Sequence, residues 1–302
     1  MGESLQIGVF LTHADDLVGP DLDQLVDVAR EIEAAGVDYL VVADHVVLGT
    51  NLASHAALGG PFPFPTDEPY PDPLVLLAAV AAVTTRVRLM TGILIAPLRP
   101  AVLLAKMAAT LACLAQGRFD LGVGTGWQQE EFDALGVPMA NRGRRLEDAV
   151  RACHELWGGG LATYRSETVA FEDVACSPTP PGGDVPVWFA GGTDQASLRR
   201  VATLGAGWLP LQAPSEAEMG QALADLTARC REAGRDPAAI GVRVPLPVTA
   251  DEGGRPDLTA MAAEAARLAA SGVTGVHVPL GALAPTRKEL SRVIPDLPGL
   301  AR

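Results

Sequence analysis

Cysteine and histidine are scarce in this chain, and neither falls into a metal-binding pattern. Cys113, Cys153, Cys176 and Cys230 stand forty, twenty-three and fifty-four residues apart, which matches neither a zinc site nor a redox pair. The five histidines include no His-Glu-x-x-His arrangement. We therefore expect no metal site, and we expect the cysteines to be reduced packing residues.

Positive charge and long hydrophobic runs are also lacking. Lys and Arg number 23 against 36 Asp and Glu, a net charge of -13, which argues against nucleic acid or an anionic membrane as the main partner. The longest apolar stretch near a helix, Pro73 to Val83, is far below the ~20 residues of a membrane span. The amino end shows no basic region followed by a hydrophobic segment. These absences predict a soluble, cytoplasmic protein.

Apolar residues are plentiful by contrast. They make up 48% of the chain, and charged residues make up 20%, so there is enough apolar surface for a large core and no signature of disorder. A length of 302 residues suits two average domains or one large α/β barrel. Because no repeat or linker marks a boundary, we expect one domain over residues 1–302.

Short apolar runs rich in β-branched residues alternate with segments of helical spacing. The eight expected strands are Leu5 to Leu11, Val37 to Ala43, Val87 to Ile95, Phe119 to Val123, Val185 to Ala190, Gly207 to Leu211, Ile240 to Val248 and Val273 to Val278. The expected helices are Leu22 to Ala35, Pro73 to Val83, Ala101 to Ala115, Arg144 to Trp157, Gln195 to Leu204, Glu216 to Ala233, Leu258 to Ala270 and Thr286 to Val293. Four helices are followed by glycines that can end a helix, Gly36, Gly205, Gly234 and Gly272.

Eight strand and helix units predict an α/β fold with a single parallel (β/α)8 TIM barrel. An open doubly wound sheet is the alternative, but no phosphate fingerprint follows the first strand. Two connections are too long for plain loops, His45 to Asp72 after strand two and Gly158 to Asp184 in the strand-four unit. Long insertions in a barrel usually belong to the active face, where we expect both.

Three glycines at alternate positions end the fourth expected strand, within the stretch Arg118 to Trp127. Gly122, Gly124 and Gly126 remove side chains from one face, which leaves room for a ligand against the backbone. Trp127 stands where a dinucleotide fingerprint would need its third glycine. The alternative is a glycine-rich turn with only steric duties.

The carboxyl ends of the other strands supply further candidates, because barrel chemistry occurs there. Asp44-His45 ends strand two, and a histidine at this position can move a proton near neutral pH. Gly191 to Asp194 precede a helix, so they either bind a phosphate or only cap the helix. His13 ends strand one in an acidic loop, and Trp127 either stacks on a flat ligand or packs on Phe132 or Leu135.

Four motifs in order give the chain a family resemblance over nearly its whole length. Met90 to Leu94, Ala105-Lys106 in the helix Pro100 to Ala115, Gly117 to Trp127 and Phe189 to Gly192 together resemble the bacterial luciferase-like flavin and deazaflavin oxidoreductases. Within that superfamily the chain is similar to the branch that uses the deazaflavin coenzyme F420. The resemblance implies a non-proline cis peptide between Gly92 and Ile93, against the back of the coenzyme ring.

The resemblance also implies a set of site residues. The expected cofactor-binding residues are Thr91, Gly92, Ile93, Gly124, Thr125, Gly126, Gly191, Gly192 and Thr193. The expected catalytic residues are His45 and Asp44, with His13 and Trp127 in the substrate pocket. Sugar-phosphate dehydrogenases of this family carry a Glu directly after Gly-Thr-Gly, where this chain has Trp127, so we do not expect that substrate.

The resulting hypothesis is an oxidoreductase that moves a hydride between F420 and an unidentified small organic substrate. One alternative is an FMN-dependent luciferase-like monooxygenase, and a second is a non-catalytic cofactor-binding or accessory subunit. Barrels of this family associate through helices beside the early strands, so the resemblance implies a homodimer.

Overall fold

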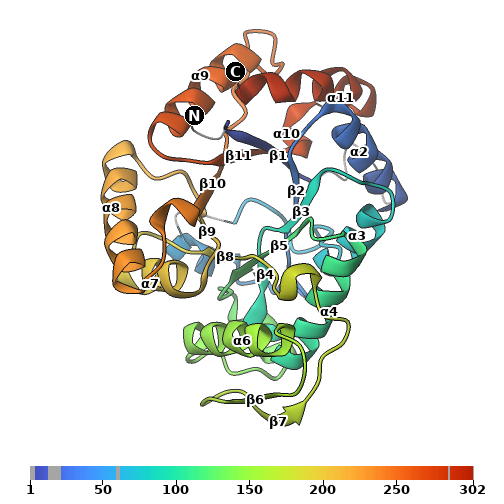
Figure 1. Ribbon diagram of the computed structural model, residues 1–302. Coiled ribbons are helices and arrows are strands. Elements are labelled where there is room, and N and C mark those ends of the chain that lie inside the picture. The colour runs from blue at the N-terminus through green and yellow to red at the C-terminus, as the bar shows by residue number, and fades with distance from the viewer. Residues whose placement is uncertain (1–3, 13–21, 59–61, 285, 302) are drawn as a thin grey trace.

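The strands of the first half and the second half of the chain meet in one closed parallel barrel (Figure 1), in a computed structural model that describes residues 4–12, 22–58, 62–284 and 286–301. The strand order is β3-β2-β1-β11-β10-β9-β8-β5-β4, and the additional pairing of β3 with β5 closes the ring. Strands β3 and β4 together occupy one strand position of the barrel, since both pair with β5. The barrel thus has eight strand positions, and the predicted TIM barrel is confirmed.

All the expected strands and helices form in the expected order. The barrel strands are β1 (Gln6–Phe10), β2 (Tyr39–Val42), β3 (Arg88–Thr91), β4 (Leu94–Ile95), β5 (Phe119–Gly124), β8 (Val187–Ala190), β9 (Gly207–Leu209), β10 (Gly241–Pro245) and β11 (Gly275–Pro279). The helices are α2 (Leu22–Ala35), α3 (Pro73–Ala81), α4 (Ala101–Leu114), α5 (Gln129–Ala134), α6 (Arg142–Trp157), α7 (Gln195–Leu204), α8 (Glu216–Glu232), α9 (Leu258–Ala270), α10 (Leu280–Leu283) and α11 (Arg287–Val293).

Side chains of alternate strand residues point to two different cores. Ile7 and Val9 of β1 are buried among the residues between the strands and the surrounding helices. Tyr39 and Val41 of β2 belong to a second cluster inside the barrel, with Trp188 of β8. The strands therefore read as continuous apolar runs because both of their faces are covered.

A buried arginine fills the inside of the barrel. Arg243 of β10 is 2% exposed, and its guanidinium carbon lies 4.3 Å from the ring centre of Tyr39 and 4.2 Å from that of Trp188. Its Nη1 atom donates to Asp120 Oδ2 at 3.0 Å, and Asp120 also accepts from Arg88 Nε at 3.0 Å. Two cations thus share one buried carboxylate, and the inside of the barrel is packed rather than hollow.

All four helices end at the expected glycines, three of them in the left-handed conformation. Gly36, Gly234 and Gly272 have φ values of +102°, +69° and +96°, the left-handed conformation that glycine adopts without steric cost. Gly205 instead has a φ of -89°. An added Cβ there would lie 3.0 Å from the Val201 carbonyl oxygen and 3.1 Å from the Phe189 ring, so this glycine permits a close approach rather than a turn.

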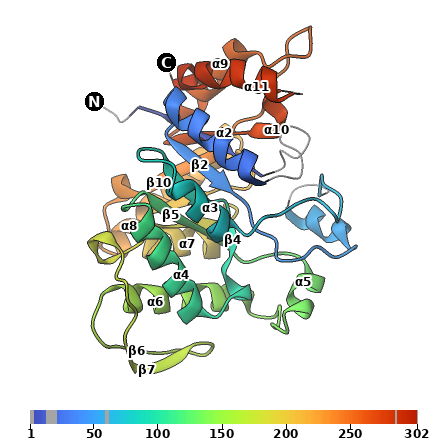
Figure 2. The same cartoon turned by 90° about the vertical axis from the view of Figure 1, so that its right-hand side faces the viewer.

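The two long connections lie in different places. Figure 2 shows the segment that follows β2 on the same side of the barrel as α5, with the N-terminus on the other side. The second connection follows α6 and contains the hairpin of β6 (Ala162–Arg165) and β7 (Ala170–Val174). Tyr164, Val169 and Phe171 of this connection pack against alanines of α4 and α6. The expectation that both insertions belong to the active face is therefore wrong for the second, because its apolar side chains cover helices instead.

None of the described helices has the length and apolarity that crossing a bilayer requires. The described part of the chain also contains no group of three or more His, Cys, Asp or Glu side chains placed to share a metal ion. The four cysteines are free thiols.

Candidate active site

The carboxyl ends of β2, β3, β5 and β8 bring most of the expected site residues to one end of the barrel. Asp44 and His45 follow β2, Gly92 and Ile93 lie between β3 and β4, and Gly191 follows β8. Parallel strands place these positions at the same edge. His13 lies outside the described residues.

A cis peptide bond joins Gly92 to Ile93, as the resemblance implied. Glycines of β5 allow this segment to approach closely. A Cβ at Gly122 would lie 1.9 Å from the Thr91 carbonyl oxygen, and one at Gly124 would lie 2.7 Å from Ile93 Cδ1. The Thr91 carbonyl group and the Ile93 side chain therefore fill the space beside these two glycines. The expectation that this space is left for a ligand is wrong at Gly122 and Gly124.

Gly126 continues the same pattern beyond the end of β5. Its φ is +75°, and an added Cβ would lie 2.7 Å from Ile95 Cγ2 and 2.9 Å from the Phe132 ring. The Gly126 carbonyl oxygen accepts a hydrogen bond from Arg142 Nε at 3.2 Å. The third glycine thus turns the chain where β4, α5 and α6 meet.

Substitution of Gly122 by alanine tests this close packing. We expect Gly122→Ala to lower the free energy of unfolding by about 1–3 kcal/mol, because the new methyl group overlaps the Thr91 carbonyl. Urea denaturation would measure the change. Gly220→Ala in α8 is the matched control, since no atom lies within 4 Å of its added Cβ, and we expect it to add about 0.5–1 kcal/mol. Equal stability of Gly122→Ala and the wild type would contradict the assignment.

Apolar side chains form the surface at the mouth of the barrel. Phe10, Ile93 and Ala190 are partly buried and pack against the buried Val41 and Leu209. These five residues come from five different strand positions of the barrel, so they make a continuous apolar floor. A flat, aromatic ligand would bury this floor favourably.

His277 of β11 adds a polar atom beside the floor. Its ring stacks on Phe10 with ring centres 5.9 Å apart, and its Nδ1 atom is buried without a hydrogen-bond partner. Burial and the nearby Arg243 cation lower the pKa of His277 to about 4. The imidazole is therefore neutral at pH 7 and offers one nitrogen for a hydrogen bond.

The principal ionisable pair at the mouth joins His45 to Glu131 of α5. The His45 Nδ1 and Glu131 Oε2 atoms are 3.1 Å apart, and the side chains are 8% and 0% exposed. Glu131 Oε1 also accepts from the Val46 backbone amide at 2.7 Å. The carboxylate holds both the His45 ring and the Val46 backbone, which leaves Nε2 as the His45 ring nitrogen that can exchange a proton with a ligand.

An aromatic wall surrounds His45. Its ring centre lies 4.9 Å from that of Tyr70, 5.7 Å from Trp127 and 5.8 Å from Phe62. Trp127 also contacts Phe62 at 5.3 Å and His55 at 5.0 Å. Burial raises the pKa of the Tyr70 hydroxyl. The indole of Trp127 thus belongs to this wall, which joins two segments far apart in the sequence.

Asp44 is occupied by structural partners. Its carboxylate accepts from Arg99 at 2.6 and 2.9 Å and from the Ile95 backbone amide at 2.8 Å. Arg99 also donates to Asp72, which caps α3. Both oxygens of Asp44 therefore hold the chain that follows the cis peptide, and the geometry supports a positioning role.

The expected phosphate turn is also a helix cap. The Asp194 side chain accepts from the backbone amides of Ala196 and Ser197 at 3.0 Å. Burial opposes the ionisation of Asp194, but hydrogen bonds from Ser197 and Ala196 and the Arg200 cation together lower its pKa. The structure thus shows the helix cap that was the alternative to a phosphate site. Gly192 and Thr193 are exposed beside this cap.

Sequence reasoning missed Glu131. It lies 86 residues after His45, and no local pattern signals a contact across that distance. Phe62 and Tyr70 in the loop after strand two already suggested an apolar or aromatic wall or else packing, and His277 at the end of the last expected strand was a candidate because strand ends carry barrel chemistry.

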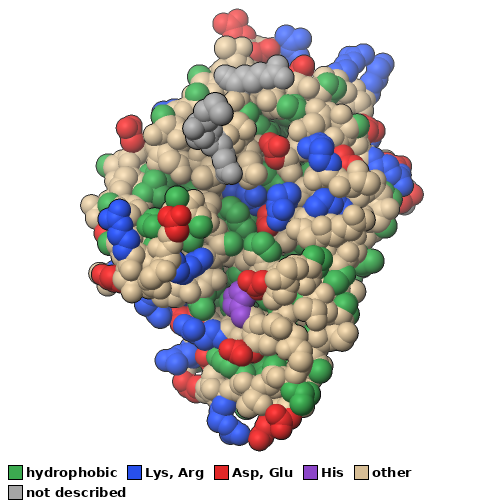
Figure 3. All heavy atoms as spheres, in the orientation of Figure 1, with side chains coloured by type: hydrophobic (Ala, Val, Ile, Leu, Met, Phe, Trp, Pro, Cys, Tyr) green, Lys and Arg blue, Asp and Glu red, His purple; other side chains and the backbone are tan. Residues whose placement is uncertain are grey.

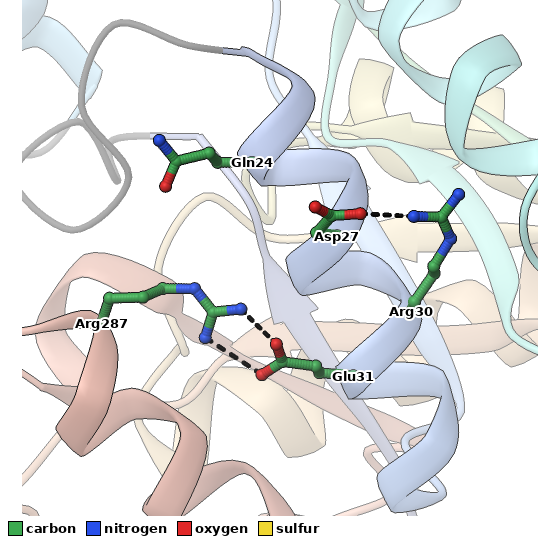
Figure 4. Close-up of a pocket in the computed structure, with 5 residues that line it drawn as sticks. All are labelled: Gln24, Asp27, Arg30, Glu31 and Arg287. Carbon is green, nitrogen blue, oxygen red and sulfur yellow. Dashed lines mark hydrogen bonds and ion pairs between the residues drawn. The ribbon is translucent and has the colours of Figure 1, made fainter.

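A separate hollow of about 370 Å³ lies between α2 and α11, on the outside of the barrel (Figure 4). Its charged side chains pair with one another. Arg287 binds Glu31, and Arg30 binds Asp27. Its charges are therefore mutually compensated and do not indicate a ligand.

Comparison with known proteins gives one family and several relatives. A family model described as luciferase-like monooxygenase matches residues 5–293. The F420-dependent glucose-6-phosphate dehydrogenase of Kineococcus radiotolerans is 36% identical over 174 residues, 56% of this chain and 47% of that protein. The pyrimidine monooxygenase RutA of Allorhizobium ampelinum is 30% identical over 180 residues, 56% of this chain and 47% of that protein.

A solved structure agrees over the whole fold. The F420-dependent secondary alcohol dehydrogenase in complex with an F420-acetone adduct superimposes with a TM-score of 0.80, at 16% identity, over 99% of both chains. The alignments with curated relatives span between 47% and 65% of the relatives' length. At 16% identity, the likeness to the secondary alcohol dehydrogenase structure shows a shared fold alone.

Proposed function

Because the chain belongs to the luciferase-like monooxygenase family, we propose that it is an oxidoreductase that transfers a hydride between coenzyme F420 and a small organic substrate. The observation that carries the proposal is the apolar floor of Phe10, Ile93 and Ala190 beside the His45 and Glu131 pair. A flat ring needs an apolar surface, and hydride transfer needs a nearby group that manages a proton.

The residues present fit a flat tricyclic ring. The floor is apolar and continuous, and the neutral His277 ring, which stacks on Phe10, lies beside it. Gly92 and Ile93 would support the ring, with Thr91, Gly124, Thr125 and Gly126 shaping that support from behind and Gly191, Gly192 and Thr193 near the phosphate. When bound, the coenzyme would accept or donate the hydride at C5 of its ring.

The chain's own side chains have distinct tasks in this proposal. His45 donates or accepts a proton at Nε2, while Glu131 fixes the orientation of its ring. Asp44 positions the Ile95 backbone and so the segment that supports the ring. Tyr70, Phe62 and Trp127 exclude water and favour an apolar or aromatic substrate.

An FMN-dependent monooxygenase is the second candidate. The apolar floor would suit an isoalloxazine ring equally, and one of the relatives is named as a monooxygenase. A non-catalytic accessory subunit is disfavoured by the buried His45 and Glu131 pair, since a subunit without chemistry has no need to bury these groups together.

Titration of the purified protein with F420 and with FMN separates these functions. We expect F420 to bind in the micromolar range or tighter, followed by the change in its fluorescence, and FMN to bind at least tenfold more weakly. Tighter binding of FMN, with oxygen consumption on reduction, would replace the first proposal by the second. Failure of both cofactors to bind would favour the accessory subunit.

The proposal includes a homodimer. Helices α3 and α4 expose Val75, Val102, Leu103 and Leu114, which are between 44% and 66% exposed, and exposed apolar side chains of this size can form an interface. The molar mass measured by light scattering would be that of two chains; the mass of one chain at micromolar concentration would contradict the dimer.

A further inference from the structure

The side chain of Gln128 binds the backbone of a residue 79 positions away in the sequence. It is fully buried. Its Oε1 atom accepts from the Gly49 backbone amide at 2.7 Å, and its Nε2 atom donates to the Gly49 carbonyl oxygen at 3.1 Å. One side-chain amide thus bonds both backbone groups of Gly49, as a neighbouring antiparallel strand would do. Because a buried amide is costly without such partners, this contact defines where the two segments meet.

Helix capping does not account for Gln128. It stands at the position before α5, where Ser, Thr, Asp and Asn are the residues that cap a helix. Its side chain makes no capping hydrogen bond to the first turn of α5. The amide therefore serves the contact with Gly49 instead of the helix that it precedes.

Gly49 lies directly on the first turn of α5. A Cβ at Gly49 would be 2.5 Å from Glu130 Cβ and 2.8 Å from Glu130 Cγ. Only glycine therefore fits this position while both backbones stay where they are. The close approach and the two hydrogen bonds of Gln128 hold the same point of the loop that follows β2.

A second contact joins the same two segments beside the first. Glu131 follows Gln128 by three residues, so the two side chains lie on the same side of α5. The Glu131 carboxylate contacts His45 Nδ1 at 3.1 Å and the Val46 backbone amide at 2.7 Å. The two contacts thus run in parallel, Gln128 with Gly49 and Glu131 with residues 45 and 46. A shift of the loop by one residue along α5 would break both.

Protein neighbours rather than solvent orient the His45 ring. Histidine makes up little of the molecular face drawn in Figure 3, and the His45 side chain is 8% exposed. Because a carboxylate only accepts hydrogen bonds, its contact with Glu131 places the proton on Nδ1. We propose that Gln128 is a positioning residue for His45: it fixes the loop on α5, so that Glu131 meets Nδ1 and Nε2 is left to exchange the proton. This inference rests on the proposed function, in which His45 moves a proton.

Gln128→Leu tests the proposal, because leucine is of similar size and makes neither hydrogen bond to Gly49. The matched control is Gln129→Leu, since Gln129 is the next residue, is exposed and donates to Asp133 within α5. Two-bond proton–nitrogen NMR spectra of protein with isotope-labelled histidine report which nitrogen of each ring carries the proton. The His45 signals are identified by their absence from His45→Ala. The measurement needs neither coenzyme nor substrate.

We expect His45 to carry its proton on Nδ1 in the wild type and in Gln129→Leu. In Gln128→Leu the ratio of the Nδ1–H to the Nε2–H tautomer should fall about tenfold or more, the effect expected from one lost hydrogen bond to a carboxylate. Gly49→Ala should cause the same change, because it displaces the loop from Glu130 while Gln128 is retained. F420 should bind all these variants as it binds the wild type, since the floor is built from other residues.

Other results would overturn the inference in distinguishable ways. A role of Gln128 in stability alone would lower the urea midpoint of Gln128→Leu and leave the His45 tautomer as in the wild type, which removes the positioning role and leaves the proposed function intact. Where Gln128→Leu does not fold, the tautomer in Gly49→Ala decides in the same way. Failure of F420 and of FMN to bind the wild type ends the proposed function, and the role of Gln128 in proton transfer ends with it.

Discussion

Replacement of Asp120 by alanine is expected to destabilise the protein by about 3–5 kcal/mol, the usual cost of removing one partner from a buried ion pair. Asp120 accepts from Arg243 at 3.0 Å, and both side chains are 3% exposed. Without the carboxylate, the Arg243 charge stays inside the barrel between Tyr39 and Trp188 with no anion to compensate it. Denaturation in urea, with the midpoint and slope compared with the wild type, measures the loss.

Two variants separate charge from packing in this prediction. Asp120→Asn keeps the size of the side chain and one hydrogen-bond acceptor. The fall in the free energy of unfolding of this variant therefore reports the missing negative charge rather than lost packing. Glu264→Ala breaks the exposed pair with Arg267 on α9, and we expect a change below about 1 kcal/mol. A loss in Asp120→Ala no greater than that of Glu264→Ala would show that the barrel interior hydrates Arg243, against the network described.

Replacement of His45 by alanine is expected to lower turnover by about 10²–10⁴, the usual contribution of a general acid or base. The reason is its position, since His45 lies at the barrel mouth with its Nδ1 held by Glu131 and its ring enclosed by Tyr70 and Trp127. Cofactor affinity should change little, because the floor is built from other residues. Steady-state kinetics and a cofactor titration on the same preparation measure the two quantities.

The chain offers a matched control for this experiment. His154 and Asp184 form a second histidine and carboxylate pair, 2.8 Å apart and partly exposed, so His154→Ala should leave turnover unchanged. Glu131→Gln preserves the shape of the His45 partner but removes its charge, and we expect a smaller loss of turnover than in His45→Ala. Unchanged turnover in His45→Ala would remove it from the mechanism.

The architecture follows from local patterns. Helices α2, α7 and α9 begin and end where the sequence predicts, because Asp194 and Asp257 cap their helices with side chains and Gly36 and Gly272 end theirs in the left-handed conformation. Apolar runs between them read as strands buried on both faces. Eight such units leave few ways to bury every strand, and closure into a barrel is one of them.

The candidate site was only partly predictable. The positions of His45, Ile93 and Trp127 at strand ends follow from the order of the elements, since parallel strands place their carboxyl ends together. Trp127 proved to belong to the aromatic wall around His45. The glycine pattern itself was misinterpreted at Gly122 and Gly124, because a sequence shows which side chains are absent but not which neighbour takes their place.

Contacts between distant segments account for the rest. Glu131 reaches His45 across 86 residues, and Arg243 reaches Asp120 across 123. Periodicity, caps and glycines act within a few residues, so the amino-acid order alone determines the barrel and its rim. Which carboxylate pairs with which cation depends on side chains that meet only after the barrel closes, so only the tertiary structure decides these pairs.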